Sequence, residues 1–167
     1  MTAAGQQWTY QDWNPGLRGP RGEPYAAVEA RRRFATGEDL WVVQRGPDEE
    51  LVVLHVRASG RSLSSYFLDG QGRPELTYLF GTGTTPGWPE DQLLLEQSEA
   101  LTYPDDRTAR PSSVQTFRFQ PDGRVSIVGG PPGGPVERLS SHLPVDQLQT
   151  EPVPSFGAWE PFLRRER

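Results

Sequence analysis

The stretch that decides the fold is "ELVVLHVRASGRSLSSYFLD", residues 50–69. Two runs rich in β-branched and aromatic residues flank the short turn "ASGR", a pattern typical of an antiparallel hairpin. The run "DLWVVQR" (39–45) precedes this hairpin and "ELTYLF" (75–80) follows it, each across a turn that contains glycine and proline. Together the four runs predict an antiparallel meander.

Two later segments extend the strand pattern. Residues 113–130 predict a further hairpin, because Pro121, Asp122 and Gly123 supply a type I turn with a glycine that tolerates positive φ. The segment "QLLLEQSEALTY" (92–103) has an apolar run too short for its periodicity to distinguish helix from strand. We therefore expect about six or seven strands in one curved antiparallel sheet.

One helix is expected before the sheet, over residues 25–36. Pro24 suits its first turn, and Gly37 can end it. Tyr25, Val28 and Phe34 fall near one face at helical spacing. The predicted fold class is thus α+β.

The whole chain, residues 1–167, is short enough to form a single domain. Residues 1–24 are expected to form a packed N-terminal arm, since three large aromatic side chains would be costly to leave in water. Residues 39–130 are expected to form the sheet. The proline-rich residues 131–167 are expected to lie across it as a C-terminal strap. The residues predicted to line the core or a cavity are Trp41, Phe67, Leu76, Phe80, Phe117, Phe119, Ile127 and Trp159.

Composition excludes several kinds of chemistry. The chain has no cysteine, which excludes disulfide scaffolds, thiol nucleophiles and cysteine-ligated metals. All seventeen basic residues are arginine, so chemistry that requires a lysine is excluded as well. We expect no cofactor and no metal. No apolar run approaches the length of a membrane span, and the first residues do not resemble a secretory signal, so we expect a cytoplasmic protein without membrane contact.

The glycine-rich segment "GTGTTPG" (81–87) follows a predicted strand and invites comparison with phosphate-binding loops. Such loops open directly into a helix whose amides face the phosphate. This one leads into Pro86, Gly87, Trp88 and Pro89, and the prolines remove amide donors. We interpret the segment as a surface turn.

Two histidines, His55 and His142, are separated by most of the predicted sheet in sequence. Either could act with a carboxylate in an enzyme, yet such a pairing fits almost any site, and structural roles are the simpler interpretation. We expect no catalytic residue. A ligand-binding alternative places His55, Tyr66 and Tyr78 around a pocket if the curved sheet closes into a barrel.

Acidic charge is concentrated in one segment. Residues 88–106 hold six carboxylates and no basic residue, whereas seventeen basic and sixteen acidic residues lie outside it. Such a surface repels nucleic acid and attracts a basic protein. The leading hypothesis is therefore an immunity or inhibitor protein that binds a basic protein partner, on the condition that both ends of the segment meet at one end of the sheet. The predicted partner-binding residues are Trp88, Glu90, Asp91, Tyr103, Asp105 and Asp106.

Overall fold

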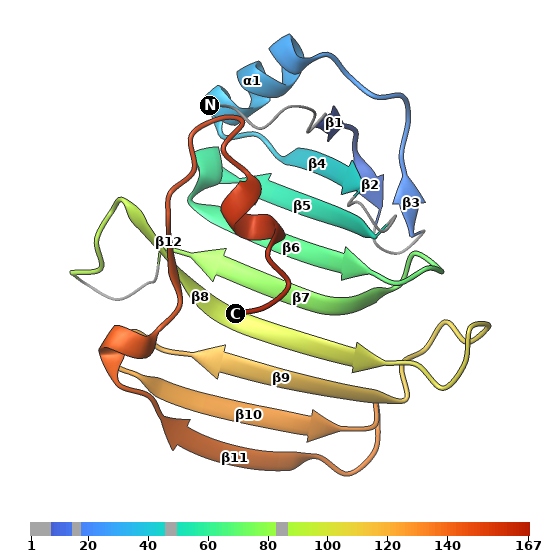
Figure 1. The fold of residues 1–167 in the computed structure, drawn as a ribbon, viewed down its shortest axis with the longest axis vertical. Helices are drawn as coiled ribbons and strands as arrows, with labels where there is room; N and C mark the ends of the chain where they lie inside the picture. Colours follow the sequence, from blue (N-terminus) through green and yellow to red (C-terminus); the bar gives the residue numbers. More distant parts are fainter. Residues whose placement is uncertain (1–7, 15–17, 46–49, 83–86) are drawn as a thin grey trace.

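The computed structural model describes residues 8–14, 18–45, 50–82 and 87–167, and its main feature is one open, twisted antiparallel sheet (Figure 1). Ten strands form this sheet in the order β1, β4, β5, β6, β7, β8, β9, β10 and β11, with β12 paired to β8. They span Thr9–Tyr10 (β1), Leu40–Arg45 (β4), Leu51–Arg57 (β5), Ser62–Leu68 (β6), Pro74–Gly81 (β7), Gln92–Thr102 (β8), Ser113–Phe119 (β9), Arg124–Gly130 (β10), Glu137–His142 (β11) and Thr150–Pro152 (β12).

The remaining elements are short. β2 (Trp13–Asn14) and β3 (Gly19–Pro20) form a separate two-stranded ribbon, and α1 spans Ala27–Thr36. Three 3-10 turns lie at Ala58–Gly60, Val145–Gln147 and Glu160–Leu163. The predicted α+β class with a mainly antiparallel sheet is thereby confirmed.

The prediction of six or seven strands, and of a sheet closed into a barrel under the ligand-binding alternative, is wrong. Residues 92–102 are a strand, and residues 137–142, expected in the strap, form β11 beside β10. The sequence of β11 is too polar to show alternation, so its pairing with β10 rather than its own pattern makes it a strand. The sheet stays open because β1 and β11 lie at opposite edges.

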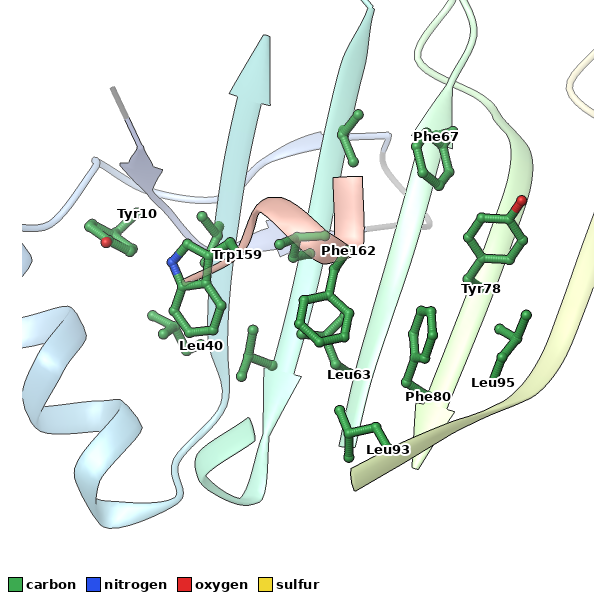
Figure 2. Packing of buried hydrophobic residues seen from close by; sticks show 14 of the residues in the cluster. Tyr10, Leu40, Leu63, Phe67, Tyr78, Phe80, Leu93, Leu95, Trp159 and Phe162 are labelled. Carbon is green, nitrogen blue, oxygen red and sulfur yellow. The ribbon is translucent and has the colours of Figure 1, made fainter. Parts of the chain in front are cut away.

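Alternation along the strands gives the sheet an inner face, defined here as the face that bears the C-terminal residues. The inner-face side chains of the middle strands are almost completely buried: Leu40, Val42, Leu54, Val56, Leu63, Phe67 and Phe80. Residues 143–167 cross this face from β11 toward α1 and back (Figure 1). Trp159 and Phe162 from this segment are fully buried against it, with the Phe162 ring centroid 5.2 Å from that of Phe80 (Figure 2).

The predicted core is correct only for the middle of the sheet. Phe67, Phe80 and Trp159 are fully buried, and Leu76 and Phe119 pack against the same cluster. Phe117 and Ile127 are half-buried. Trp41 lies on the outer face, because its cross-strand partner is His55 and the inner positions of β4 are Leu40 and Val42.

Helix α1 begins two residues later than expected. The Tyr25 amide donates to the Tyr10 carbonyl, which keeps Tyr25 in an extended segment, so the helix starts at Ala27. Val28, expected on the buried face, is 77% exposed. Gly37 ends the helix in the left-handed conformation, with φ of 74°, as the sequence predicted.

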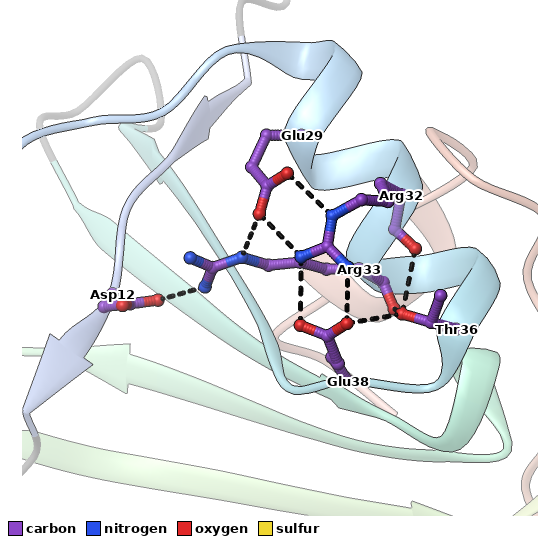
Figure 3. A network of polar contacts seen from close by, with 6 residues as sticks. All are labelled: Asp12, Glu29, Arg32, Arg33, Thr36 and Glu38. Atoms are coloured by element: carbon purple, nitrogen blue, oxygen red, sulfur yellow. Dashed lines mark hydrogen bonds and ion pairs between the residues drawn. The ribbon is translucent and has the colours of Figure 1, made fainter.

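Charged side chains attach α1 to the N-terminal arm (Figure 3). Arg33 donates to Glu29 within the helix and to Asp12 in the arm, and Arg32 joins Glu29 to Glu38. Hydrogen bonds from Arg32 and then Arg33 lower the pKa of Glu29 to about 2. Because these groups are largely exposed, the network orients the arm more than it stabilises the fold.

The turn between β5 and β6 is strained. Ala58, Ser59 and Gly60 all have positive φ, at 47°, 56° and 87°. Side-chain crowding makes this left-handed conformation unfavourable for Ala58 and Ser59 by about 1–2 kcal/mol per residue. The turn is held from outside, because the Ser59 hydroxyl donates to the Phe34 carbonyl at the end of α1 and Gly60 lies against Pro154.

Candidate functional site

A hollow opens on the inner face beside the C-terminal segment, where β8 changes partner. The last part of β8 pairs with β9, whereas its first residues, Gln92–Leu94, pair with β12. The hollow has a volume of about 290 Å³. Its lining residues are Tyr78, Leu95, Ser98, Phe117, Phe119, Leu143, Gln147, Leu148, Gln149 and Arg167.

The floor of this pocket is set by strand register. Tyr78 pairs with Ser98, and Ser98 pairs with Phe117, so the three side chains stand in one row across β7, β8 and β9. Ser98 is the small member of the row and leaves the space between two aromatic rings. Six of the ten lining residues are apolar or aromatic, and the polar groups are few.

The wall of the pocket comes from residues 143–149, which connect β11 to β12. The Leu95 amide donates to the Gln149 carbonyl and the Leu143 amide to the Gly123 carbonyl, so both ends of this segment are attached to the sheet. Leu148 is buried, while Leu143 is half-buried at the rim. The pocket therefore lies between two backbone-anchored elements, as ligand sites generally do.

Among the described residues that line the pocket, Arg167 has the one charged side chain. Its side chain is 4% exposed, and its guanidinium lies over the rings of Phe80 and Tyr78, at 4.9 and 5.5 Å from their centroids. It donates to Glu151 at 2.6 Å and to the Pro161 carbonyl. Its Nε has no acceptor within the described residues. A buried donor without an acceptor is costly, but this Nε has almost no accessible surface, so a molecule in the hollow would meet other atoms of the Arg167 side chain.

The hydroxyl of Tyr78 is already used in a hydrogen bond within the fold. Its Oη donates to the Arg165 carbonyl at 2.6 Å, and burial raises the pKa of the phenol above 10.0. The group therefore stays protonated at neutral pH, and its ring, rather than its oxygen, is what the pocket can offer. Of the three residues predicted for a ligand pocket, Tyr78 lies in this one.

The other two predicted pocket residues, His55 and Tyr66, lie on the outer face. The His55 ring stacks on Trp41 with centroids 3.9 Å apart and planes 4° apart, and Trp41 also contacts Tyr66. Burial lowers the pKa of His55 below 6.5, although Asp39 opposes this effect with its Oδ2 3.2 Å from Nε2. His55, Tyr66 and Tyr78 therefore do not share one site.

The two histidines are also far apart. His55 lies in β5 and the exposed His142 lies in β11, with five strands between them. His142 pairs with Arg124, and no carboxylate contact of His142 is found in the described ranges. On the outer face His55 has Asp39 beside it and Ser64 opposite it across the β5–β6 pairing, but no hydrogen bond between His55 and Ser64 is found in the described residues. The enzyme hypothesis gains no assembled site from this geometry.

The acidic segment is divided by the fold. Glu90 and Asp91 precede β8 and Asp105 and Asp106 follow it, so the two pairs lie at opposite ends of an 11-residue strand (Figure 1). At about 3.3 Å per residue, this strand separates them by roughly 35 Å. The expectation that both turns emerge at one end of the sheet is wrong, because consecutive connections of a meander alternate between its two ends.

The aromatic residues of that segment have local partners. The Trp88 Nε1 donates to the Gln92 carbonyl, next to Glu90 and Asp91. Tyr103 donates to the Pro74 carbonyl and lies under the Arg73 guanidinium at 4.1 Å. The Asp105 carboxylate accepts from the Arg107 and Thr108 amides and so closes its own loop. A surface made from all six residues does not exist in this fold.

The predicted turn at 81–87 lies partly outside the described residues, which resume at Gly87 after residues 83–86. Gly81 is the last residue of β7, and Gly87 has a positive φ of 89°. No helix follows, since residues 88–91 lead directly into β8. A helix N-terminus that could bind phosphate is therefore not present after this segment.

Further searches of the described ranges found no group of three or more histidine or acidic residues placed to hold a metal ion. Within the same ranges, no helix is long and apolar enough to cross a membrane. Comparisons with family models, curated proteins and solved structures found no match to this chain.

Sequence reasoning missed most of the pocket. The sequence predicts Phe117 and Phe119 only as core or cavity residues without a site, and residues 143–149 only as part of a strap. Arg167 carried no sequence signal, because a terminal arginine among Arg164, Arg165 and Glu166 looks like an exposed charged run. The alternation of "SVQTFRF" did place Phe117 and Phe119 on one face, which is the only advance indication of an aromatic site there.

Proposed function

We propose that this chain is a small-molecule-binding protein and that its ligand occupies the inner-face pocket between β7–β9 and residues 143–149. The observation that carries the proposal is a mainly apolar hollow whose few polar lining side chains, among them Ser98, Gln147 and Arg167, can donate hydrogen bonds. Concave, mostly apolar pockets with a few directed polar groups are the usual form of ligand sites.

The chemistry of the lining selects the class of ligand. Phe117, Phe119 and Leu95 offer an apolar surface, whereas Ser98, Gln147 and Arg167 offer hydrogen-bond donors. No carboxylate is present among the lining residues, so the pocket suits a molecule with an apolar body and an accepting or anionic end. The volume of about 290 Å³ is near the lower limit for ligand pockets and corresponds to a small molecule.

A second, more open hollow continues along the same face. It has a volume of about 570 Å³ and includes Ala100 and Gln115, each two residues along its strand from Ser98 and Phe117. Residues two apart on a strand share a face, so the two hollows adjoin. A ligand longer than the first pocket can therefore extend toward Gly129 and Glu137.

Titration with octanoate tests the proposal, with octylamine as the probe of opposite charge and equal chain length. We expect octanoate to raise the melting temperature in a concentration-dependent manner and to bind measurably by calorimetry, because a ligand that binds only the folded state stabilises it. Octylamine should bind more weakly, because no carboxylate is among the described lining residues to pair with its ammonium group, whereas Ser98 and Gln147 can donate to the carboxylate of octanoate.

The substitution Ser98→Phe fills the pocket between Tyr78 and Phe117 and should abolish octanoate binding. Ser126→Phe is the matched control, since Ser126 is exposed on the outer face of β10 and should leave binding unchanged. Equal octanoate binding by the wild type and by the Ser98→Phe variant would show that the pocket is not the site.

A further inference from the structure

The two edge strands of the sheet, β1 and β11, differ in how well they are protected from pairing with another strand. At one edge, β1 has only two residues, and the Tyr25 amide already donates to its Tyr10 carbonyl. At the other edge, β11 has six residues, all of them exposed, with no proline and no register shift in its pairing with β10 (Figure 1). Sheet edges are usually shortened, covered, bulged or charged along their length, because an open edge invites pairing with another strand.

The backbone of β11 has hydrogen-bonding groups that point away from β10. The Leu143 amide donates to the Gly123 carbonyl, and these residues continue the β10–β11 register. Antiparallel bonds alternate along a strand, so the odd-numbered residues of β11 bond to β10. The amides and carbonyls of Arg138, Ser140 and His142 therefore point outward from the sheet edge.

An apolar row ends at this edge. Phe117 pairs with Ile127 and Ile127 pairs with Leu139, so the three side chains form one row on the inner face. Leu139 is 65% exposed at the end of the row. Val136 and Val145 are also exposed nearby, so three of the four large exposed apolar residues in the described ranges lie around β11. Clustered exposed apolar side chains mark interaction surfaces.

The edge is complementary to itself in a specific register. If a two-fold axis perpendicular to the sheet relates two copies of the chain, both inner faces lie on the same side. Odd-numbered residues of one β11 then pair with odd-numbered residues of the other, and even-numbered residues with even-numbered ones. Pairing Arg138 with its own copy, or Glu137 with its own copy, would place like charges directly opposite, which is destabilising. Centring the axis on Leu139 pairs Leu139 with Leu139, Arg138 with Ser140 and Glu137 with Ser141, and no like charges meet. Centring it on Ser140 avoids like charges as well, but it places Leu139 opposite Ser141 and so loses the contact between the two leucines.

We propose that a second copy of this chain pairs with β11 in antiparallel orientation, with Leu139 opposite Leu139, to form a continuous sheet across a two-fold dimer. The outward groups of Arg138 and Ser140 supply its backbone hydrogen bonds. The two Leu139 side chains join the inner-face rows of both copies. The paired residues of this interface do not line the first pocket, and Glu137 is the one that lines the second hollow among the described residues.

Sedimentation measurements across a wide range of protein concentrations test the dimer. The wild type should shift from monomer to dimer as concentration rises. Ser140→Pro removes an outward amide without removing a bond to β10, and should raise the dimer dissociation constant by at least about tenfold. Ser140→Ala keeps the amide and should dimerise like the wild type. A wild type that remains monomeric at every concentration would overturn the proposal.

Single-cysteine variants test the register without interference, since the chain contains no cysteine. Leu139→Cys should form an intermolecular disulfide under mild oxidation, because the Cα atoms of a directly opposed, non-hydrogen-bonded pair are about 4.5 Å apart. Ser140→Cys should not, since it faces Arg138, and the exposed Val28→Cys should not either. Cross-linking through Ser140 in place of Leu139 would overturn the register, and equal cross-linking of all three variants would show random collision.

Discussion

The two halves of the inner face differ in what covers them. Over β4–β8, the C-terminal segment adds Trp159 and Phe162, and the side chains below are almost completely buried. Over β9–β11, the described residues add only the 143–149 segment along one side, and Phe117 and Ile127 stay half-buried. The inner positions of β9 and β10 also carry apolar side chains, such as Phe117, Phe119 and Ile127, so for these strands the difference comes from the crossing segment.

The comparison assigns different roles to the two halves. Buried apolar area stabilises a fold, whereas a partly exposed apolar face is available to bind a ligand or a partner. The covered half contains the large buried aromatic residues, the candidate pocket lies at the boundary between the two halves, and the open half contains the free edge. Stability and binding are thus expected to respond to different substitutions, as the following predictions state.

The largest expected effect is that of Trp159→Ala in the covered half. Trp159 is fully buried and contacts the Phe34 and Phe156 rings, with centroids 5.7 and 6.0 Å away. Removing a buried large side chain leaves a cavity, so the free energy of unfolding should fall by about 3 kcal/mol or more. Denaturant titration measures this, and an unchanged unfolding midpoint would show that the C-terminal segment does not hold the core.

A smaller effect is expected from Ile127→Ala in the open half. Ile127 is half-buried, so less apolar contact is lost, and the free energy of unfolding should fall by about 1 kcal/mol. The same denaturant titration applies. A loss as large as that of Trp159→Ala would mean that the open half is covered in solution, and repeating the titration at low protein concentration would then separate a covering second copy from a covering segment of the same chain.

The substitution Ala58→Gly, in the turn between β5 and β6 beside the covered half, should stabilise the protein. Ala58 has φ of 47°, which glycine adopts without side-chain crowding. Relief of that strain should exceed the added entropy of the unfolded chain and raise the free energy of unfolding by about 0.5 kcal/mol. Ala100→Gly, in the extended strand β8, is the control and should lower it. If Ala58→Gly also destabilises, the positive φ at this turn is not a source of strain.

The smallest effect is a pH dependence at His55, on the outer face of the covered half. Burial lowers its folded-state pKa below 6.5, with Asp39 opposing and Arg57 adding to the shift. The unfolded chain therefore takes up the proton first, so stability is retained above pH 6.5 and falls as the pH drops below it. His55→Phe keeps a ring against Trp41 and should reduce the slope of melting temperature against pH just below about pH 6.5. An identical slope in both proteins would contradict this assignment.

The sequence predicted secondary-structure elements correctly where the pattern of consecutive residues determines them. Alternation identified β4, β5, β6 and β7, and the Asp122–Gly123 turn was correct, since Gly123 has φ of 88° and its amide donates to the Gln120 carbonyl. Gly37 likewise ends α1. These features depend on backbone conformation and on the two-residue period of a strand, both of which are written in consecutive residues.

The candidate site was decided by contacts between distant parts of the chain. Tyr78, Phe117 and Arg167 meet only after three strands pair and the C-terminal segment crosses them, and the turns beside Asp91 and Asp105 separate because the meander reverses along β8. The sequence by itself therefore determined the antiparallel sheet, its α+β class and the excluded chemistries. Only the tertiary structure decided which half of the inner face is covered, because that depends on where residues 143–167 find a complementary surface, and no local period encodes that position.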